Sequence, residues 1–146
     1  MTVPALKYLL VEDDDSHAMI IQRTLERDEV HCEVARVSNG VEALSYLRRE
    51  GVYSDRERPD VVLLDLNLPR LNGHEVLAEV KTDPELRGIP IVVLSTSDTE
   101  SDRCRAYGNL ANSYLVKPAS FEKFREMVRI LNSYWGTWNR PATCKA

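Results

Sequence analysis

The chain has 146 residues, of which 43% are hydrophobic and 29% charged, a composition that fits one globular domain and excludes a mainly disordered chain. The 19 Lys and Arg residues against 23 Asp and Glu residues give a net charge of −4 without basic clusters, which argues against nucleic acid or an anionic membrane as a partner. No apolar run exceeds four residues, whereas a membrane-spanning helix needs about 20, and the first residues lack a secretory pattern, so we expect a cytoplasmic protein.

Strand and helix patterns alternate along the first half of the chain. The apolar run Leu6–Val11 is typical of a strand buried on both faces, and it ends in the acidic turn 12–15. Polar capping residues and apolar spacing then place the next elements. The predictions are a helix from an N-cap at Asp15 or Ser16 to near Asp28, a strand over Cys32–Val37, a helix after Asn39-Gly40 to about Glu50, and a charged loop over 51–59.

The second half repeats this arrangement. Val61–Leu64 is an apolar run that again delivers a carboxylate, Asp65, at its carboxyl end. The further predictions are a helix after the turn 67–73 that ends at Asp83-Pro84, a strand over Ile89–Leu94 that runs into Ser95-Thr96-Ser97, a helix over about 98–107, a strand over Ser113–Val116 that runs into Lys117-Pro118, and a last helix over about 120–135.

Five strands that alternate with helices indicate an α/β domain with a mainly parallel sheet, because a helix normally supplies the parallel crossover. In such sheets, ligands and chemistry gather outside the carboxyl ends of the strands. Here those ends carry Glu12, Asp13, Asp65, Ser95 and Lys117.

Carboxylates that converge at one edge raise one another's pKa unless positive charge balances them. Lys117 can supply one positive charge. The remaining negative charge suits a hard divalent cation that takes oxygen ligands, and among such cations Mg²⁺ fits best. The Asp13 and Asp65 carboxylates with the Asn67 backbone carbonyl would suffice as protein ligands. Open metal positions, Lys117 and the Ser95 hydroxyl could then contact phosphoryl oxygens. Asp65 would be the nucleophile and would form an acyl phosphate.

At these residues the sequence resembles the receiver domains of two-component response regulators, from Leu6 to about Leu131. The matching motifs are Glu12-Asp13, Asp65 within Leu-Asp-Leu-Asn-Leu-Pro-x-x-x-Gly, Ser95-Thr96, Tyr114 and Lys117-Pro118. The resemblance implies a flavodoxin-like fold, with a five-stranded parallel sheet in the order 2-1-3-4-5 and helices on both faces. It also implies a phosphoacceptor that takes part in its own phosphorylation and dephosphorylation but has no separate substrate.

The resemblance assigns a role to each matched residue. Asp65 would accept a phosphoryl group from a histidine kinase, and Lys117 would pair with the phosphoryl oxygens. Mg²⁺ would be bound, directly or through water, by Glu12, Asp13, Asp65 and the Asn67 carbonyl.

Ser95 and Tyr114 would form the switch pair. A new dianionic group at Asp65 offers the Ser95 hydroxyl a strong acceptor, and drawing Ser95 inward leaves space that the Tyr114 ring can fill. The energy of this change can come only from contacts that differ between the two states.

A narrower resemblance is to single-domain response regulators paired with bacterial phytochrome histidine kinases. It rests on the charged loop 51–59, the stretch 73–84, Ile89-Pro90 and the segment 93–97. We expect a receiver domain over 1–135 and a tail over 136–146 without a separate output domain, so that output goes through protein contacts or the chain is a phosphoryl carrier.

The last helix carries more apolar surface than docking on a sheet requires. Its two neighbouring stripes are Phe121, Phe124, Val128, Leu131 and Trp135, and Met127, Ile130, Tyr134 and Trp138. The last strand and the tail could cover the excess, but exposed apolar patches often mark interfaces. We therefore predict a homodimer through this helix and its neighbours.

Three other functions compete with this interpretation. An aspartate-nucleophile phosphohydrolase usually carries a second Asp two residues after the nucleophile, where this chain has Asn67. A flavodoxin-like flavin carrier fits the order of elements, but the loops are lined with carboxylates. A receiver-like module that binds its partner constitutively is the third alternative.

The remaining cysteines and histidines suggest no chemistry. Three scattered cysteines, Cys32, Cys104 and Cys144, lack the spacing of a disulfide framework or a zinc site and are expected to be free thiols. The histidines share no ligand spacing and are expected at the surface; they are His17, His31 and His74.

Overall fold

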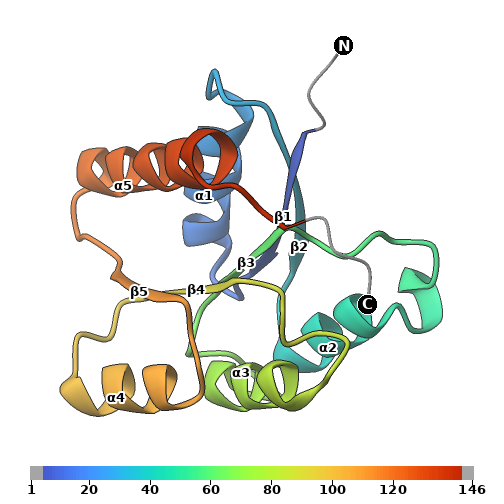
Figure 1. Ribbon diagram of the computed structural model, residues 1–146. Helices are drawn as coiled ribbons and strands as arrows, with labels where there is room; N and C mark the ends of the chain where they lie inside the picture. The colour runs from blue at the N-terminus through green and yellow to red at the C-terminus, as the bar shows by residue number, and fades with distance from the viewer. Residues whose placement is uncertain (1–4, 143–146) are drawn as a thin grey trace.

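The computed structural model describes residues 5–142, in which five strands alternate with five helices (Figure 1). The elements are β1 (Leu6–Val11), α1 (Asp15–Glu26), β2 (Cys32–Val37), α2 (Gly40–Arg48), β3 (Val61–Leu64), α3 (Gly73–Thr82), β4 (Ile91–Ser95), α4 (Glu100–Gly108), β5 (Ser113–Val116) and α5 (Phe121–Ser133). A short 3₁₀ turn, η1 (Gly51–Tyr53), follows α2, and a π-helical turn, η2 (Tyr134–Trp138), continues α5.

The strands form one parallel sheet in the order β2-β1-β3-β4-β5, which confirms the predicted fold and strand order. Leu10 of β1 lies opposite Leu63 of β3, which in turn lies opposite Val92 of β4. Because all strands run the same way, their carboxyl ends meet at one edge of the sheet.

Helices cover both faces of the sheet, with α1 and α5 on one side and α2, α3 and α4 on the other (Figure 1). Alternate residues of β1 divide between the two cores: Leu9 and Val11 pack toward α2 and α3, whereas Tyr8 and Leu10 pack toward α1 and α5. Every residue of β3 and β4 is buried. This double burial explains why their sequences are continuous apolar runs.

Capping side chains shift several predicted boundaries by one to three residues. The N-cap of α1 is Asp14, which accepts a hydrogen bond from the His17 N–H, and not Asp15 or Ser16. The helix ends at Glu26, before Asp28. Thr99 caps α4, which therefore begins later than predicted.

Strand β4 begins at Ile91, so the predicted start at Ile89 is wrong. The residue between them is Pro90, which has no backbone N–H to donate to a sheet. Its carbonyl still accepts from the Val62 N–H at 2.9 Å.

The apolar surface of α5 is only partly buried. Phe124, Val128 and Leu131 belong to the core, but Phe121, predicted in the same stripe, is 65% exposed because it occupies the first turn. The regular helix ends at Ser133, and the wider π-turn carries Trp138 into solvent.

Among residues 5–142, no helix is long and apolar enough to cross a membrane. Cys32 and Cys104 are free thiols, as predicted. Cys144 lies outside the described residues.

Candidate functional site

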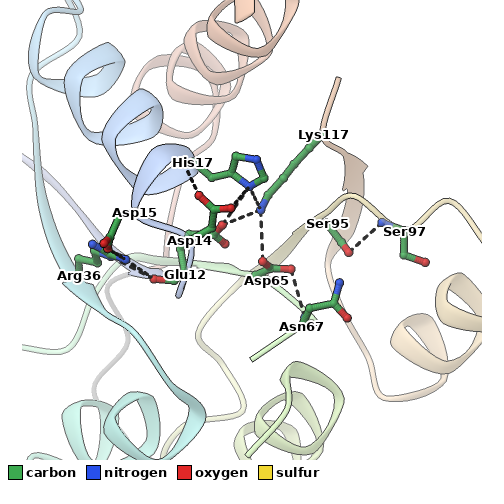
Figure 2. Close-up of polar contacts among 10 residues, drawn as sticks. All are labelled: Glu12, Asp14, Asp15, His17, Arg36, Asp65, Asn67, Ser95, Ser97 and Lys117. Atoms are coloured by element: carbon green, nitrogen blue, oxygen red, sulfur yellow. Dashed lines mark hydrogen bonds and ion pairs between the residues drawn. The ribbon is translucent and has the colours of Figure 1, made fainter. Parts of the chain in front are cut away.

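The carboxyl edge of the sheet brings together Glu12, Asp65 and Lys117, as predicted (Figure 2). The Lys117 Nζ donates to Glu12 Oε1 at 2.8 Å and to Asp65 Oδ2 at 3.2 Å. All three side chains are buried, with the Lys117 side chain only 2% exposed. One cation thus bridges two carboxylates from different strands in a region of low solvent access.

Backbone hydrogen bonds between neighbouring strands fix Asp65 and Lys117 of this cluster. The Asp65 N–H donates to the Val11 carbonyl at 3.0 Å, and the Lys117 N–H donates to the Ser95 carbonyl at 2.8 Å. The sheet register therefore sets the positions of these side chains, although they lie far apart in sequence.

Two buried carboxyl groups share one lysine in this cluster. Burial raises the pKa of Glu12 to about 8, and the neighbouring Asp65 carboxyl adds to the rise, while Lys117 opposes it. Asp13 follows Glu12 directly in the chain, and it is exposed to solvent. An additional cation beside Glu12 and Asp65 would oppose the rise in the Glu12 pKa, so this pair of carboxyl groups fits a cation site.

The donor set suits a cation that keeps much of its water. Among residues 5–142, no three Asp, Glu, His or Cys side chains form a preassembled metal cage. Mg²⁺ needs only one or two carboxylates besides water, whereas a zinc site would need a fuller protein shell. The residues present therefore fit a loosely held hard cation.

The loop after β3 orients the Asp65 carboxylate. The Asn67 N–H donates to Asp65 Oδ1 at 3.2 Å, and the Asn67 side chain is exposed to solvent. A Cβ at Gly73 would lie 2.3 Å from the Asp65 carbonyl oxygen. Only glycine allows α3 to begin this close to the backbone of Asp65.

The predicted switch residues lie on the adjoining strands β4 and β5. Ser95 is fully buried, and its Oγ accepts a hydrogen bond from the Ser97 N–H at 3.1 Å (Figure 2). The Tyr114 hydroxyl donates to the Ser97 carbonyl at 2.9 Å. Both side chains therefore hold the same loop in this conformation.

Two residues of the site were not predicted from the sequence. Arg36 of β2 donates from Nε and Nη2 to the Glu12 carbonyl at 3.0 and 2.9 Å, and it pairs with Asp15 at 2.9 Å. His17 was expected at the surface without a role, but its Nδ1 lies 3.0 Å from Lys117 Nζ. Because β2 lies beside β1, a cationic residue near the end of β2 was the one sequence feature that could have indicated a role for Arg36.

The other histidines divide between surface and interior. His31 is exposed, as predicted. His74 is only 5% exposed, so the prediction of a surface residue was wrong; it faces the core side of α3 and contacts Asp102 of α4.

Known proteins are similar to this sequence over most of its length. Residues 8–129 match the response regulator receiver domain. The probable methanogenesis regulatory protein FilR2 of Methanothrix harundinacea is 48% identical over 133 residues, which are 90% of this chain and 84% of FilR2. The response regulator Rcp1 of Synechocystis sp. is 38% identical, and the alignment covers 90% of each protein.

Two solved structures share the fold closely. The phosphorylated cyanobacterial phytochrome response regulator RcpA superposes with a TM-score of 0.91 at 42% identity, covering 94% of this chain and 98% of RcpA. The Mn²⁺-bound form of Rcp1 superposes with a TM-score of 0.90 at 36% identity, covering 94% of this chain and 99% of Rcp1.

Proposed function

Because the chain belongs to the response regulator receiver domain family, we propose that Asp65 accepts a phosphoryl group from a sensor histidine kinase in a Mg²⁺-dependent reaction. The observation that carries this proposal is the buried Asp65 carboxylate, 3.2 Å from the Lys117 ammonium at the carboxyl edge of the sheet. A carboxylate held beside a cation suits attack on phosphorus, because the cation neutralises charge on the transferred oxygens.

The transfer is a displacement at phosphorus. An Asp65 oxygen forms a bond to phosphorus while the bond from phosphorus to the kinase imidazole nitrogen breaks, and the imidazole keeps that electron pair. The Asn67 N–H orients the carboxylate through Oδ1. Lys117, already in contact with Asp65, pairs with a phosphoryl oxygen.

The metal would be held by Glu12, Asp13, Asp65 and the Asn67 carbonyl, directly or through water. When bound, Mg²⁺ neutralises phosphoryl oxygens as a Lewis acid. The paired carboxyl groups of Glu12 and Asp65 and the Mn²⁺-bound form of the relative Rcp1 support a divalent cation here. The choice of Mg²⁺ follows from the preference of that ion for oxygen ligands and retained water.

The kinase partner we propose is of the phytochrome type. Support comes from the similarity to RcpA, a phytochrome response regulator, over nearly the whole of both chains. The protein would undergo its own phosphorylation and dephosphorylation without a separate substrate.

Phosphorylation would act through Ser95 and Tyr114. The Ser95 hydroxyl would leave the Ser97 N–H and turn to a phosphoryl oxygen, and the Tyr114 ring would then move toward the vacated space. The contacts of both residues with Ser97 support this role, because they tie the two side chains to one loop.

The partners would include a second copy of the chain. An apolar groove of about 790 Å³ runs between the edge strand β5 and α5, and Ile130 and Tyr134, both exposed, contribute to it. A groove of this kind suits burial against another apolar surface. A partnership with nucleic acid or membrane is not expected from the charge pattern.

The domain limits and the location stay predictions. A receiver domain over 1–135 agrees with the family match over 8–129, and the start of the tail packs near the sheet, since a Cβ at Gly136 would lie 2.5 Å from Val30 Cγ1. The cytoplasmic location is untested.

The test is phosphoryl transfer from a purified, autophosphorylated phytochrome-type histidine kinase with Mg²⁺ present. We expect the label to move from the kinase to the native chain and not to Asp65→Asn. Retention of the label on the kinase would contradict the kinase assignment. Release of inorganic phosphate from small phosphate esters would instead favour the hydrolase, and partner binding without any label would favour the constitutive module.

A further inference from the structure

The ammonium group of Lys117 has a third neighbour besides the two carboxylates. His17 Nδ1 lies 3.0 Å from Lys117 Nζ, between the distances to Glu12 and Asp65 (Figure 2). The Lys117 side chain is 2% exposed, so its N–H groups depend mainly on protein acceptors. An ammonium has three donors, and this site offers three acceptors.

The contact defines the tautomer of His17. An ammonium can only donate, so Nδ1 must accept and carries no proton. Nδ1 also lies 3.2 Å from Glu12 Oε1, but without a proton it cannot donate there. In this contact the imidazole therefore acts as a hydrogen-bond acceptor for Lys117.

The ring is held in place from two sides. The backbone N–H of His17 donates to the side chain of Asp14, the N-cap of α1, at 3.0 Å, and this bond fixes the first turn of the helix. The ring packs against Phe124 of α5, with centroids 5.8 Å apart. Because both contacts come from outside the carboxylate cluster, they preorganise Nδ1 toward Lys117.

We propose that His17 is a positioning residue that holds the Lys117 ammonium in the unphosphorylated protein and gives up this contact to a phosphoryl oxygen. This inference rests on the proposed function. His17, Glu12 and Asp65 are the three acceptors for the N–H groups of Lys117, so a phosphoryl oxygen can bond to Lys117 only if one of these contacts is given up. His17 therefore competes with the phosphoryl group for one N–H of Lys117.

The test compares two substitutions of similar size. In His17→Asn, the amide oxygen takes the place of Nδ1 as an acceptor, whereas His17→Leu removes the acceptor and keeps the bulk. The probe is beryllofluoride, a phosphoryl mimic, titrated with Mg²⁺ and followed by NMR. We expect about fivefold tighter binding by His17→Leu, and binding within about twofold of the native protein by His17→Asn. Equal affinities of the two variants would overturn the proposal.

A second readout needs neither metal nor phosphoryl group. Hydrogen exchange of the Lys117 ammonium, followed by NMR at one pH without metal, should be about tenfold faster in His17→Leu than in the native protein. His17→Asn should restore slow exchange, and His17→Ala repeats the comparison if the leucine variant folds poorly. Equal exchange in all variants would overturn the inference. A native protein that binds no beryllofluoride would contradict the proposed function alone, because the exchange result would still report on His17.

Discussion

His74 and Asp102 join the neighbouring helices α3 and α4 on one face of the sheet, with His74 Nε2 2.9 Å from Asp102 Oδ1. The other Asp102 oxygen accepts from the hydroxyls of Ser97 and Thr99. Since the Tyr114 hydroxyl also bonds to Ser97, the Asp102 carboxylate links α3 to the same loop that Tyr114 contacts. This arrangement ties the β4–α4 loop to two helices and to β5.

The Asp102 contacts predict a pH-dependent stability. Hydrogen bonds from Ser97 and His74 hold the pKa of Asp102 below its usual value near 3.8. A carboxyl group whose pKa is lowered by folding stabilises the protein above its unfolded pKa, and that contribution is lost as the pH falls through the folded pKa.

Urea unfolding of the native protein and Asp102→Asn between pH 3 and 6 measures this effect. We expect the native protein to be more stable at pH 6, with the difference shrinking below about pH 4. Asp55→Asn, which removes an exposed carboxylate, serves as the control. A difference independent of pH would show that Asp102 does not stabilise the fold through its charge.

Tyr114→Phe should loosen the β4–α4 loop, because it removes the hydrogen bond to the Ser97 carbonyl. We expect a loss of about 0.5–1.5 kcal/mol in the free energy of unfolding and faster amide exchange in residues 97–99. Tyr107→Phe, at an exposed position on α4, should change neither quantity. Unchanged loop exchange in Tyr114→Phe would refute the role of this hydroxyl.

Gly73→Ala should disturb both the fold and the site. The new Cβ would meet the Asp65 carbonyl oxygen and the Leu66 Cα at 2.3 and 2.6 Å, so the start of α3 must shift. Overpacking of this kind costs about 1–3 kcal/mol or more, and we expect slower phosphorylation as well. A Cβ at Gly88 would have no neighbour within 4 Å, so Gly88→Ala is the matched control. Equal stability of the two variants by urea unfolding would contradict the close approach.

Ile130→Glu should convert the proposed homodimer to a monomer. Ile130 is 62% exposed and lines the groove beside β5, so a charge there would have to be desolvated in a dimer. Sedimentation of the native chain, with and without a phosphoryl donor, gives the reference state. Val52→Glu places the same charge on another exposed apolar residue. A native protein that is monomeric with and without the phosphoryl donor would contradict the proposed homodimer.

The alternation of strands and helices and the central cluster could be predicted because they depend on features that are local in sequence, whereas the strand order followed from the resemblance to receiver domains. The apolar runs before Asp65 and Lys117 each end in the functional residue, and parallel strands bring such ends together. The alternation of Leu9 and Leu10 between two cores follows from the pleat of the strand.

The missed residues depend on tertiary contacts that no spacing reveals. His17 meets Lys117 across 100 positions of sequence, and His74 meets Asp102 across 28. A single histidine in a helix carries no periodic signal, so neither its burial nor its partner could be predicted. The shifted start of α1 has a smaller cause, because Asp14, Asp15 and Ser16 are all good capping residues.

The central claim, that Asp65 is the phosphoacceptor, is tested most directly by intact mass after incubation with Mg²⁺ and a small-molecule phosphoryl donor. The native protein should gain one labile phosphoryl group. Asp65→Asn and a chelator-treated sample should gain none, whereas Asp55→Asn should behave as the native protein does. A native chain that gains no mass, or an Asp65→Asn chain that gains the same labile group, would contradict the account.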